Sequence, residues 1–445
     1  MKGAVLVGWA LTLGACVEEL SVGAVKADAG TSPLCQAAYP QPVVMTTPDE
    51  QLFVGGVQRT DGSIVAAEVV RASSKTFSRL LSLDTKGLTG KLDVMLDSGA
   101  QQEAVVLIAD GDGWALAGNT LGKDSDIWFV RVSAAGVPQA TSVDLGGSES
   151  VYGLAKLANS YLVSGQRSGV GLTSAFFAVL DNKGSCVKNC TAQYTGGAGS
   201  NSSSGNAIAL LPGGDFLLAG ESIPAKGNGG LDAAIWRIGA DFKEQAFVAH
   251  GGAGEDWFWG IQAASVPSQG WLAFGQRNGE GWIIAVDAYG KELWQRTLPA
   301  TKDVLSVAAI AQGWAIGAKT AGGQRLLGID PLGNILWQQN HLGKPYSVLE
   351  RPQGFALVGD LQGDARVLFT DQWGHAECSA GGLCAVVLTC DDKLPCTDDV
   401  CTAKAGCVHS QAAAGQPCDD GQPCTGPDSC TGGKCTSTPL AGCGG

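Results

Sequence analysis

The sequence predicts an all-β protein: a β-propeller, with seven four-stranded blades as the favoured count, followed by a small disulfide-rich module at the C-terminus. Three observations carry this prediction. A short apolar segment ending in glycine recurs through the middle of the 445-residue chain, other strand-like segments separate its copies, and cysteines crowd the end of the chain. No stretch shows the sustained 3.6-residue period and caps that a helical solenoid would need.

The composition excludes several classes of protein. The chain carries 42 Asp and Glu against 29 Lys and Arg, a formal net charge of −13, and only 16% of its residues are charged. Nucleic acids and anionic membranes are bound by basic patches, so we expect no nucleic-acid partner. The four histidines are far apart in the sequence, which disfavours a His-based metal site or triad. Fifteen cysteines indicate an oxidising compartment.

Residues 1–15 have the pattern of a signal peptide, with one basic residue, Lys2, and an apolar run from Ala4 to Leu13. The run is short for a membrane span, which takes about 20 apolar residues. Leu13-Gly14-Ala15-Cys16 resembles the bacterial lipobox, whose cysteine is acylated and becomes the mature N-terminus. Lipidation of Cys16 would leave an even fourteen cysteines. The alternative is ordinary secretory cleavage near Ala15, with Cys16 as a disulfide partner.

The sorting signal next to the lipobox favours the outer membrane of a Gram-negative bacterium. The residue after Cys16 is Val17 and not Asp, which by resemblance to known lipoprotein sorting favours the outer over the inner membrane. The N-terminal lipid, such as palmitate, is then the sole membrane contact that we expect. Residues 16–35 are predicted to be a tether.

The propeller is predicted over residues 36–378. Its glycine-ended segments finish at Gly55, Gly118, Gly165, Gly220, Gly275, Gly317 and Gly359. Each is followed by a second strand that ends in a turn, often by a third with Trp, and by a fourth, poorer strand before the next copy. Four short strands in about 40 to 50 residues are typical of a propeller blade. Seven repeats between Cys35 and Cys378 average 49 residues, although a long first repeat leaves six or eight blades open.

The glycine-ended strands alternate large and small side chains. In the second of them Trp114 and Leu116 alternate with Ala115 and Ala117. We expect large residues of one blade to pack against small residues of its neighbour.

These repeats resemble the GGWxLxG and DxWxVxxDxxG repeats of bacterial extracytoplasmic propellers, found in secreted proteins and lipoproteins. Two of them, Val286–Trp294 and Ile329–Trp337, also resemble the Asp-x-x-Gly-x-x-x-Trp pattern of quinoprotein-type propellers. That resemblance implies a tight turn at Asp and Gly and a Trp wedged between blades. The chain lacks a vicinal cysteine pair and a Glu/Asn/Asp set for calcium beside a quinone, so we expect no cofactor and no redox activity.

The C-terminal module is predicted over residues 390–445, after a linker at 379–389. Two units, 390–407 and 418–435, both begin Cys-Asp-Asp-x-x-Pro-Cys-Thr. They resemble slime-mould-type extracellular cysteine-rich repeats and the tails of myxobacterial surface proteins. So small a segment needs disulfides in place of a core. The candidate disulfide cysteines here are Cys390, Cys396, Cys401, Cys407, Cys418, Cys424, Cys430, Cys435 and Cys443.

Metal binding by these residues is the disfavoured alternative. A zinc ribbon needs C-x2-C pairs, whereas the spacings here are C-x5-C and C-x4-C. Calcium binding by Asp391, Asp392, Asp419 and Asp420 is an alternative to simple turn formation, which we favour. Asp110 and Asp112 resemble the start of a calcium loop but lack its later ligands, so a hairpin turn is predicted. We therefore predict no metal site.

Five further cysteines belong to the propeller region. We predict that Cys186 and Cys190 pair in a turn of one repeat. Cys35 precedes the first blade, and Cys378 and Cys384 follow the last one. A propeller must fasten its first blade to its last, and we expect Cys35 to pair with Cys378 or Cys384 for this purpose.

No enzymatic activity is predicted. The chain has no G-x-S-x-G, HExxH or phosphate-loop motif and no residue that we would name as catalytic. Loops between second and third strands and between blades should gather on one face. There Arg167, Asp256, Trp257 and Arg277 are the candidate ligand-binding residues, for a polar ligand on an aromatic surface. The alternative is that Trp257 and Trp259 pack between blades and the arginines are solvated.

The sequence therefore predicts a non-enzymatic outer-membrane lipoprotein, exposed at the cell surface or facing the periplasm. Its propeller would be a binding or structural module for a protein or glycan ligand. A second hypothesis is a periplasmic scaffold resembling the outer-membrane-protein assembly propeller, whose family lacks an acidic cysteine-rich tail. A third is a propeller hydrolase or lyase acting on polysaccharide.

Overall fold

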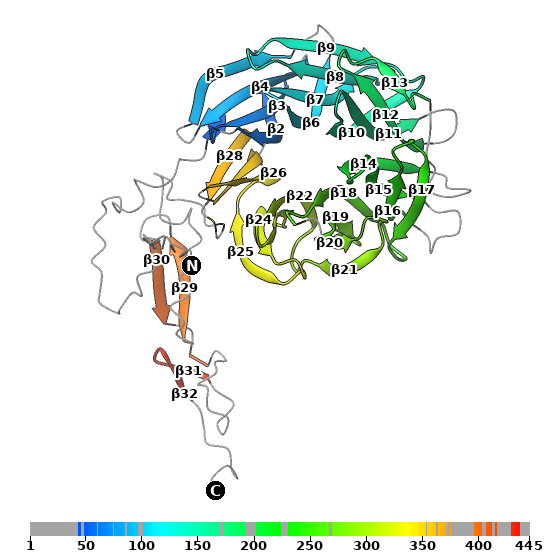
Figure 1. Cartoon of the computed structure of the whole chain (residues 1–445). Helices are drawn as coiled ribbons and strands as arrows, with labels where there is room; N and C mark the ends of the chain where they lie inside the picture. The colour runs from blue at the N-terminus through cyan, green and yellow to red at the C-terminus, as the bar shows by residue number, and fades with distance from the viewer. Residues whose placement is uncertain are drawn as a thin grey trace, which may run out of the picture.

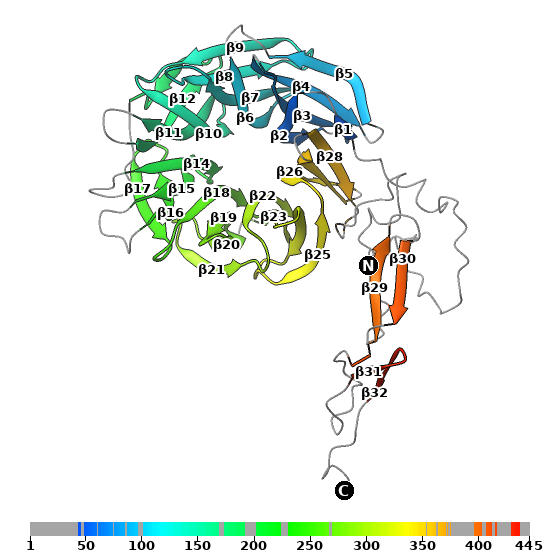
Figure 2. The ribbon, with the colours of Figure 1, turned by 180° about the vertical axis from the view of Figure 1, so that it is seen from behind.

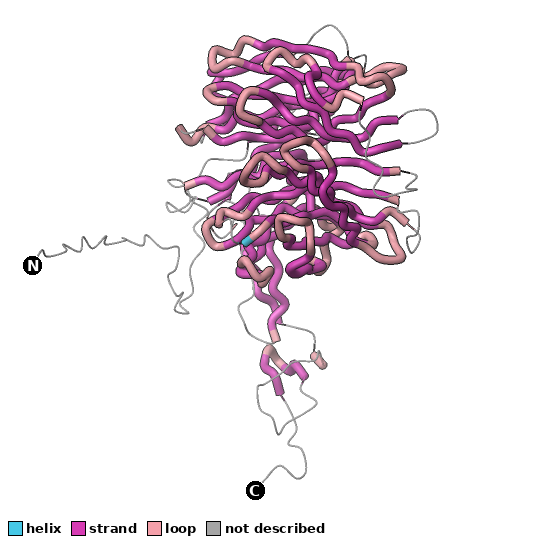
Figure 3. The backbone as a smooth tube through the Cα atoms, turned by 45° about the vertical axis from the view of Figure 1, so that its right-hand side comes forward, coloured by secondary structure: helices cyan, strands magenta, loops and turns pink. Residues whose placement is uncertain are grey.

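A computed structural model gives the fold of the chain. It describes residues 43–45, 49–59, 61–73, 75–84, 87–96, 101–168, 173–191, 202–223, 230–266, 269–352, 354–361, 364–370, 372, 374, 396–402, 406–411, 414–415 and 429–436. Nearly all of the described backbone is strand or loop (Figure 3). Within these ranges no helix has the length and apolar character of a membrane span.

Seven four-stranded antiparallel sheets form a closed ring, which confirms the predicted β-propeller and its blade count (Figure 1). Blade 1 contains β2 (Glu50–Gln58), β3 (Ile64–Arg71), β4 (Thr76–Asp84) and β5 (Gly87–Met95). Blade 2 contains β6 (Gln102–Asp110), β7 (Gly113–Thr120), β8 (Ile127–Val132) and β9 (Pro138–Val143). Blade 3 contains β10 (Ser148–Lys156), β11 (Ser160–Ser168), β12 (Thr173–Asp181) and β13 (Cys186–Lys188).

The remaining blades follow in chain order. Blade 4 contains β14 (Ser203–Leu210), β15 (Phe216–Ser222), β16 (Asp232–Ile238) and β17 (Glu244–His250). Blade 5 contains β18 (Asp256–Ala263), β19 (Trp271–Arg277), β20 (Glu280–Val286) and β21 (Glu292–Thr297). Blade 6 contains β22 (Asp303–Ile310), β23 (Gly313–Lys319), β24 (Gln324–Ile329) and β25 (Ile335–His341). Blade 7 contains β26 (Lys344–Arg351), β27 (Gly354–Leu361), β28 (Asp364–Thr370) and β1 (Val43–Met45).

The ring closes through its most N-terminal described strand. β1 pairs antiparallel with β28, so that Val43 lies opposite Val367 and Met45 opposite Ala365. This N-terminal strand thereby completes the last blade, and the two ends of the ring are joined by a backbone ladder. The cysteines that we expected to fasten the ring, Cys35, Cys378 and Cys384, lie outside the described residues.

The core consists of apolar layers between neighbouring blades. The large side chains Trp114 and Leu116 of β7 belong to the cluster shared with blade 1, and the small Ala115 and Ala117 to the cluster shared with blade 3. The predicted nesting of large against small faces is therefore confirmed. Equivalent clusters lie between every other pair of neighbouring blades, including blades 7 and 1.

The recurring glycine of the repeats has a steric cause. In five blades it lies on the second strand, where a Cβ atom would overlap a backbone carbonyl oxygen of the first strand; these glycines are Gly118, Gly165, Gly220, Gly275 and Gly359. Gly317 occupies the second strand of blade 6, against the Ser306 side chain. Gly55 differs, because its LFVG segment belongs to β2, the first strand of blade 1. The second strand of that blade carries the buried Glu68 at the corresponding register, which made the first repeat appear long.

The two Asp-x-x-Gly-x-x-x-Trp segments form the predicted tight turns. Asp330 accepts hydrogen bonds from the backbone amides of Leu332 and Asn334, and Gly333 has φ = 81°. The Trp294 indole of blade 5 lies against Gly333 in blade 6 and donates to the Pro331 carbonyl oxygen at 2.9 Å. Each of these two tryptophans thus packs against a glycine turn of the next blade, Trp294 at Gly333 and Trp337 at Gly374, as the resemblance implied.

Gly333→Ala is expected to destabilise the propeller by about 2 kcal/mol, against about 1 kcal/mol for Gly213→Ala. Both glycines have positive φ, which penalises alanine. A Cβ at Gly333 would also lie 2.6 Å from the Trp294 ring, whereas at Gly213 it would meet nothing within 4 Å. Urea unfolding of both variants measures the difference. An equal loss in the two would show that the Trp294 contact contributes nothing.

The C-terminal module contains two hairpins outside the ring (Figures 1 and 2). β29 (Thr397–Thr402) pairs with β30 (Gly406–Gln411), and β31 (Ser429–Thr431) pairs with β32 (Lys434–Thr436). A disulfide between Cys396 and Cys430 joins the first predicted unit to the second, and both cysteines are buried. The two units are therefore linked to each other. The predicted Cys186–Cys190 disulfide is also present, at the outer strand of blade 3.

Candidate functional site

Each blade places one extra residue on its innermost strand. In all seven first strands the pairing with the second strand shifts by one residue, which is the mark of a β-bulge. These strands surround the axis of the ring (Figure 1). The bulged residues are Val54, Val105, Tyr152, Asn206, Trp259, Leu305 and Tyr346. Bulges re-aim side chains and are common beside functional sites.

A cavity of about 380 Å³ lies where blades 7, 1 and 2 meet around the axis. It is at the end of the ring formed by the loops between second and third strands and by the connections between blades, which we call the loop face. Its walls are Glu50, Leu52, Val54, Arg71, Glu103, Ala104, Val105, Lys344, Tyr346 and Asp360. The cavity is therefore built from the first strands of three blades and the ends of two second strands.

Charges of both signs alternate around this cavity. Arg71 forms ion pairs with Glu50 at 3.3 Å and Glu103 at 2.6 Å, which connects blade 1 to blade 2. Lys344 lies 3.4 Å from Asp360 across blade 7. Burial, with the charge of Asp360, raises the pKa of Tyr346 to about 12. At neutral pH its hydroxyl therefore stays protonated. The cavity combines carboxylates, two cations and a phenol, a set suited to a ligand rich in polar groups.

Two tryptophans lie on the first strand of blade 5. Trp257 and Trp259 stand edge to face with ring centroids 6.0 Å apart, while Phe258 between them is buried in the core. Trp259 is 43% exposed, whereas the aromatic side chains of the core are buried. Its indole Nε1 donates to both carboxylate oxygens of Asp303 in blade 6, at 2.9 and 2.8 Å. The Asp303 carboxylate thus holds an exposed indole in one orientation.

Asp303 has an unusual pKa for a carboxyl group. Burial raises the pKa to about 6, although the Trp259 hydrogen bond and the charge of Lys319 oppose the rise. Because the folded-state pKa lies above the ordinary value of 3.8, the folded protein binds more protons than the unfolded chain between about pH 4 and 6. Stability contributed by this group is therefore present at low pH and is lost as the pH rises through 6.

Asp303→Asn is expected to stabilise the protein at pH 7.5 by about 1–2 kcal/mol, after allowance for solvent screening. The amide keeps an acceptor for Trp259 and removes the charge that burial disfavours. The gain should vanish near pH 4, where the wild-type carboxyl is itself neutral. Denaturant midpoints at the two pH values provide the measurement, with the exposed Glu280→Gln as the control. A gain that is the same at both pH values would contradict this assignment.

The structure places the four predicted ligand-binding residues in different settings. Arg167 and Asp256 are 9% and 0% exposed, and both hold loops. Arg167 donates to the Gly146 carbonyl oxygen at 3.0 Å. Asp256 accepts from the amides of Gly252 and Asn278 at 2.9 and 3.1 Å.

Trp257 near the start of β18 and Arg277 at the end of β19 lie at the loop-face ends of these two strands. Asp256 is the cross-strand neighbour of Arg277, and Trp257 is that of Gln276. The Arg277 guanidinium lies 5.3 Å from the Trp282 ring centroid and donates to Gln295. The structure thus brings Asp256, Trp257 and Arg277 together on blade 5, and leaves Arg167 on blade 3.

Sequence reasoning missed the residues that line the cavity. Lys344 and Tyr346 lie more than 200 residues from Glu50, Arg71 and Glu103, and ring closure brings the two groups together. The bulges were also missed, because a one-residue insertion in a strand leaves no mark in the repeat spacing. A partial signal did exist: in five blades the second-strand glycine pairs with the residue just before the bulge, where a Cβ atom would overlap a carbonyl oxygen of the first strand.

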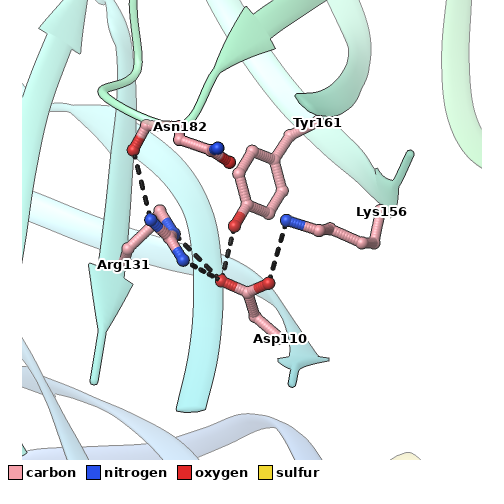
Figure 4. A network of polar contacts seen from close by, with 5 residues as sticks. All are labelled: Asp110, Arg131, Lys156, Tyr161 and Asn182. Atoms are coloured by element: carbon pink, nitrogen blue, oxygen red, sulfur yellow. Dashed lines mark hydrogen bonds and ion pairs between the residues drawn. The ribbon is translucent and has the colours of Figure 1, made fainter. Parts of the chain in front are cut away.

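A second polar cluster lies on the opposite face of the ring and joins blades 2 and 3 (Figure 4). Asp110 accepts hydrogen bonds from the Tyr161 hydroxyl at 2.5 Å and from Arg131 at 2.8 and 2.9 Å, and its other oxygen lies 2.9 Å from Lys156 Nζ. Asp110 ends β6 and Gly113 begins β7, so the predicted hairpin turn is confirmed. The aspartate binds neighbouring side chains as an inter-blade tie.

Comparisons with known proteins were made at the level of sequence and of structure. No protein-family model matches the sequence, and no curated protein matches it. Similar solved structures include BamB from Moraxella catarrhalis, 14% identical over 71% of this chain and 84% of that one, with a TM-score of 0.40. Sqt1 from Chaetomium thermophilum is 11% identical over 85% and 91%, with a TM-score of 0.45. Sqt1 from Saccharomyces cerevisiae is 10% identical over 74% and 99%, with a TM-score of 0.44. These similarities carry no information on ligand or activity.

Proposed function

We propose that this protein is a non-enzymatic binding module whose loop face binds a glycan. The observation that carries the proposal is the polar cavity of about 380 Å³ at the axis end of blades 7, 1 and 2. Across the axis, blade 5 contributes the exposed indole of Trp259. A glycan presents hydroxyl groups, which both donate and accept hydrogen bonds, and apolar ring faces, which pack on aromatic side chains.

The charges of the cavity favour binding over catalysis. The carboxylates of Glu50 and Glu103 are both engaged by Arg71, and Asp360 lies beside Lys344. A glycosidase needs two carboxyl groups free to act as acid and as base or nucleophile on opposite sides of a scissile bond. Ion-paired carboxylates instead offer fixed acceptors between fixed donors, which is an arrangement that orients a ligand.

A glycan array probed with the full chain tests the proposal. Binding of a defined set of glycans is expected, and Trp259→Ala and Lys344→Ala should each reduce it by about tenfold or more, which corresponds to about 1.4 kcal/mol or more of lost contact. Tyr289→Ala is the matched control, because Tyr289 is 60% exposed but lies in the turn between β20 and β21, on the opposite face.

Three results would contradict the proposal. These are no binding above background, binding that survives both loop-face changes, or cleavage of a bound polysaccharide. Cleavage would favour the hydrolase or lyase hypothesis, and capture of a periplasmic assembly protein through the same face would favour a scaffold.

The proposal includes attachment to the outer membrane through lipidated Cys16, with the propeller at the cell surface. Metabolic labelling with an alkyne fatty acid should mark the wild type, and Cys16→Ser should abolish the label. Protease treatment of whole cells should remove the propeller. Protection until the outer membrane is permeabilised would place it in the periplasm.

A further inference from the structure

Three carboxylates meet on the loop face between blades 2 and 3, and we infer that they bind one calcium ion. Asp126 directly precedes β8, Asp144 lies in the loop after β9, and Glu149 is on β10. Their carboxylate oxygens lie within 4.8 Å of one another. Two oxygens bound to one Ca²⁺ at about 2.3–2.6 Å are at most about 5 Å apart, so the three can share an ion.

Glu149 is the member of this cluster whose buried carboxylate would gain most from a bound cation. It is 0% exposed, and among the described residues neither of its carboxylate oxygens accepts a hydrogen bond of normal geometry. Burial raises the pKa of Glu149, opposed by the nearby Leu145 amide and Arg167, while Asp144 and Asp126 add to the rise. A buried carboxylate without hydrogen bonds is costly, and a cation coordinated by it would remove that cost.

The corresponding junction between blades 4 and 5 provides an internal comparison. There Asp232 at the start of β16 takes the position of Asp126, and the buried Asp256 on β18 takes that of Glu149. Both oxygens of Asp256 accept backbone amides. Gly251 takes the place of Asp144, because residue 251 directly follows β17 as residue 144 directly follows β9, and a glycine offers no carboxylate there. The buried acid of one junction thus has a hydrogen bond on each oxygen, whereas Glu149 at the other has none of normal geometry among the described residues and only the Arg167 ion pair at 3.4 Å.

The charge balance at the junction of blades 2 and 3 matches a divalent cation. Arg167 Nε lies 3.4 Å from Glu149 and its terminal nitrogen donates to backbone carbonyl oxygens, so one positive charge faces three negative ones. Two negative charges remain. All three side-chain ligands are carboxylates, which suit hard cations such as Ca²⁺, whereas zinc and copper favour imidazole and thiolate ligands. Water and backbone carbonyl groups would supply the remaining oxygens of a calcium shell.

Such an ion would join three segments that the chain leaves separate. Asp126 follows the loop between β7 and β8, and Asp144 and Glu149 flank the connection from blade 2 to blade 3. Gly146, with φ = 87°, donates its amide to Asp144 at 2.5 Å and folds that connection back toward the cluster. A calcium ion here would stabilise the loop face, independently of the glycan proposal.

Calcium titration of the metal-free full chain tests this inference. Ca²⁺ should raise the melting temperature, and calorimetry should detect binding in the submillimolar to millimolar range typical of extracellular modules. Tb³⁺ luminescence sensitised by tryptophan provides a second reading, since Trp128 lies two residues from Asp126. Asp144→Asn and Glu149→Gln should each weaken this site by about tenfold or more.

The controls separate this site from other acidic groups of the chain. Asp232→Asn, the equivalent of Asp126 at the junction of blades 4 and 5, should leave the calcium response unchanged. Asp144 is exposed, so its variant is expected to fold even where Glu149→Gln does not. Calcium binding that Asp144→Asn leaves at full strength would place the ion elsewhere, for example on the aspartates of the C-terminal module. That result, or no calcium response in the wild type, overturns the inference.

Discussion

Asp110→Ala is expected to destabilise the propeller by about 3 kcal/mol, because it removes the shared partner of three side chains on two blades. The Asp110 side chain is 7% exposed, while Arg131 and Lys156 are each about one-third exposed. The variant leaves the Tyr161 hydroxyl without its acceptor and the two cations without their counter-charge. Urea unfolding should show the loss as a lower midpoint.

A graded series distinguishes charge from hydrogen bonding at this cluster. Asp110→Asn keeps an acceptor for Tyr161 and should cost about half as much as Asp110→Ala. The exposed Asp112→Ala, two residues away in the same hairpin, should change stability by less than about 0.5 kcal/mol. A double-mutant cycle with Tyr161→Phe would show coupling if the contact is energetic. Equal effects at positions 110 and 112 would rule out the network as a source of stability.

The effect of Asp110 should depend on pH in a defined direction. Burial would raise the pKa of Asp110, but the hydrogen bonds from Tyr161, Lys156 and Arg131 outweigh it and hold the pKa below its ordinary value of 3.8. A carboxyl group with a lowered folded-state pKa stabilises the fold above the unfolded pKa and loses that contribution as the pH falls. The difference between wild type and Asp110→Asn should therefore be full at pH 7 and shrink below pH 4.

A chain that begins at residue 46 is expected to lose about 3 kcal/mol or more relative to one that begins at residue 40. Both lack the N-terminal segment, but only the shorter one lacks β1 and its ladder of three residue pairs with β28. Without β1, the Val367 strand becomes an open edge and blade 7 has three strands. Melting curves and the oligomeric state of both chains should be measured.

The outcomes of this truncation are distinct. A lower melting temperature, or edge-to-edge association of the shorter chain, would support closure by β1. Identical melting of the two monomeric chains would show that the apolar layer between blades 1 and 7 closes the ring without the ladder.

The fold was largely predictable because every blade repeats one local pattern. Trp114 and Ala115 already indicated which faces of β7 pack on which neighbours, and Gly290 and Gly333 marked the turns. The first repeat was the exception, since Glu68 replaces the expected glycine on its second strand. Glu68 is buried and forms an ion pair with Arg79, so an ion pair occupies the position at which glycine was expected.

The candidate site was less predictable, because its residues come from distant blades. Trp257 and Arg277 were expected in loops next to a glycine repeat, and the structure places them at the ends of β18 and β19. From the sequence, Trp259 was considered only as a residue that packs between blades. Its exposure depends on the bulge that turns it from the core toward the axis. Burial also could not be read from the sequence: Arg167 and Asp256 were expected in polar loops, yet they lie on β11 and β18 and bind backbone carbonyl and amide groups.

The pairing of β1 with β28 also sets an order of events during biogenesis. Its two strands lie about 320 residues apart in the chain, so β1 must wait for the synthesis of nearly the whole propeller before it can pair. Blades 1 to 6 each consist of consecutive strands and can form by local pairing as they appear. Until β28 arrives, β1 remains an unpaired strand. During synthesis that strand is therefore open to pairing with other chains, and it loses this exposure only when the ring closes.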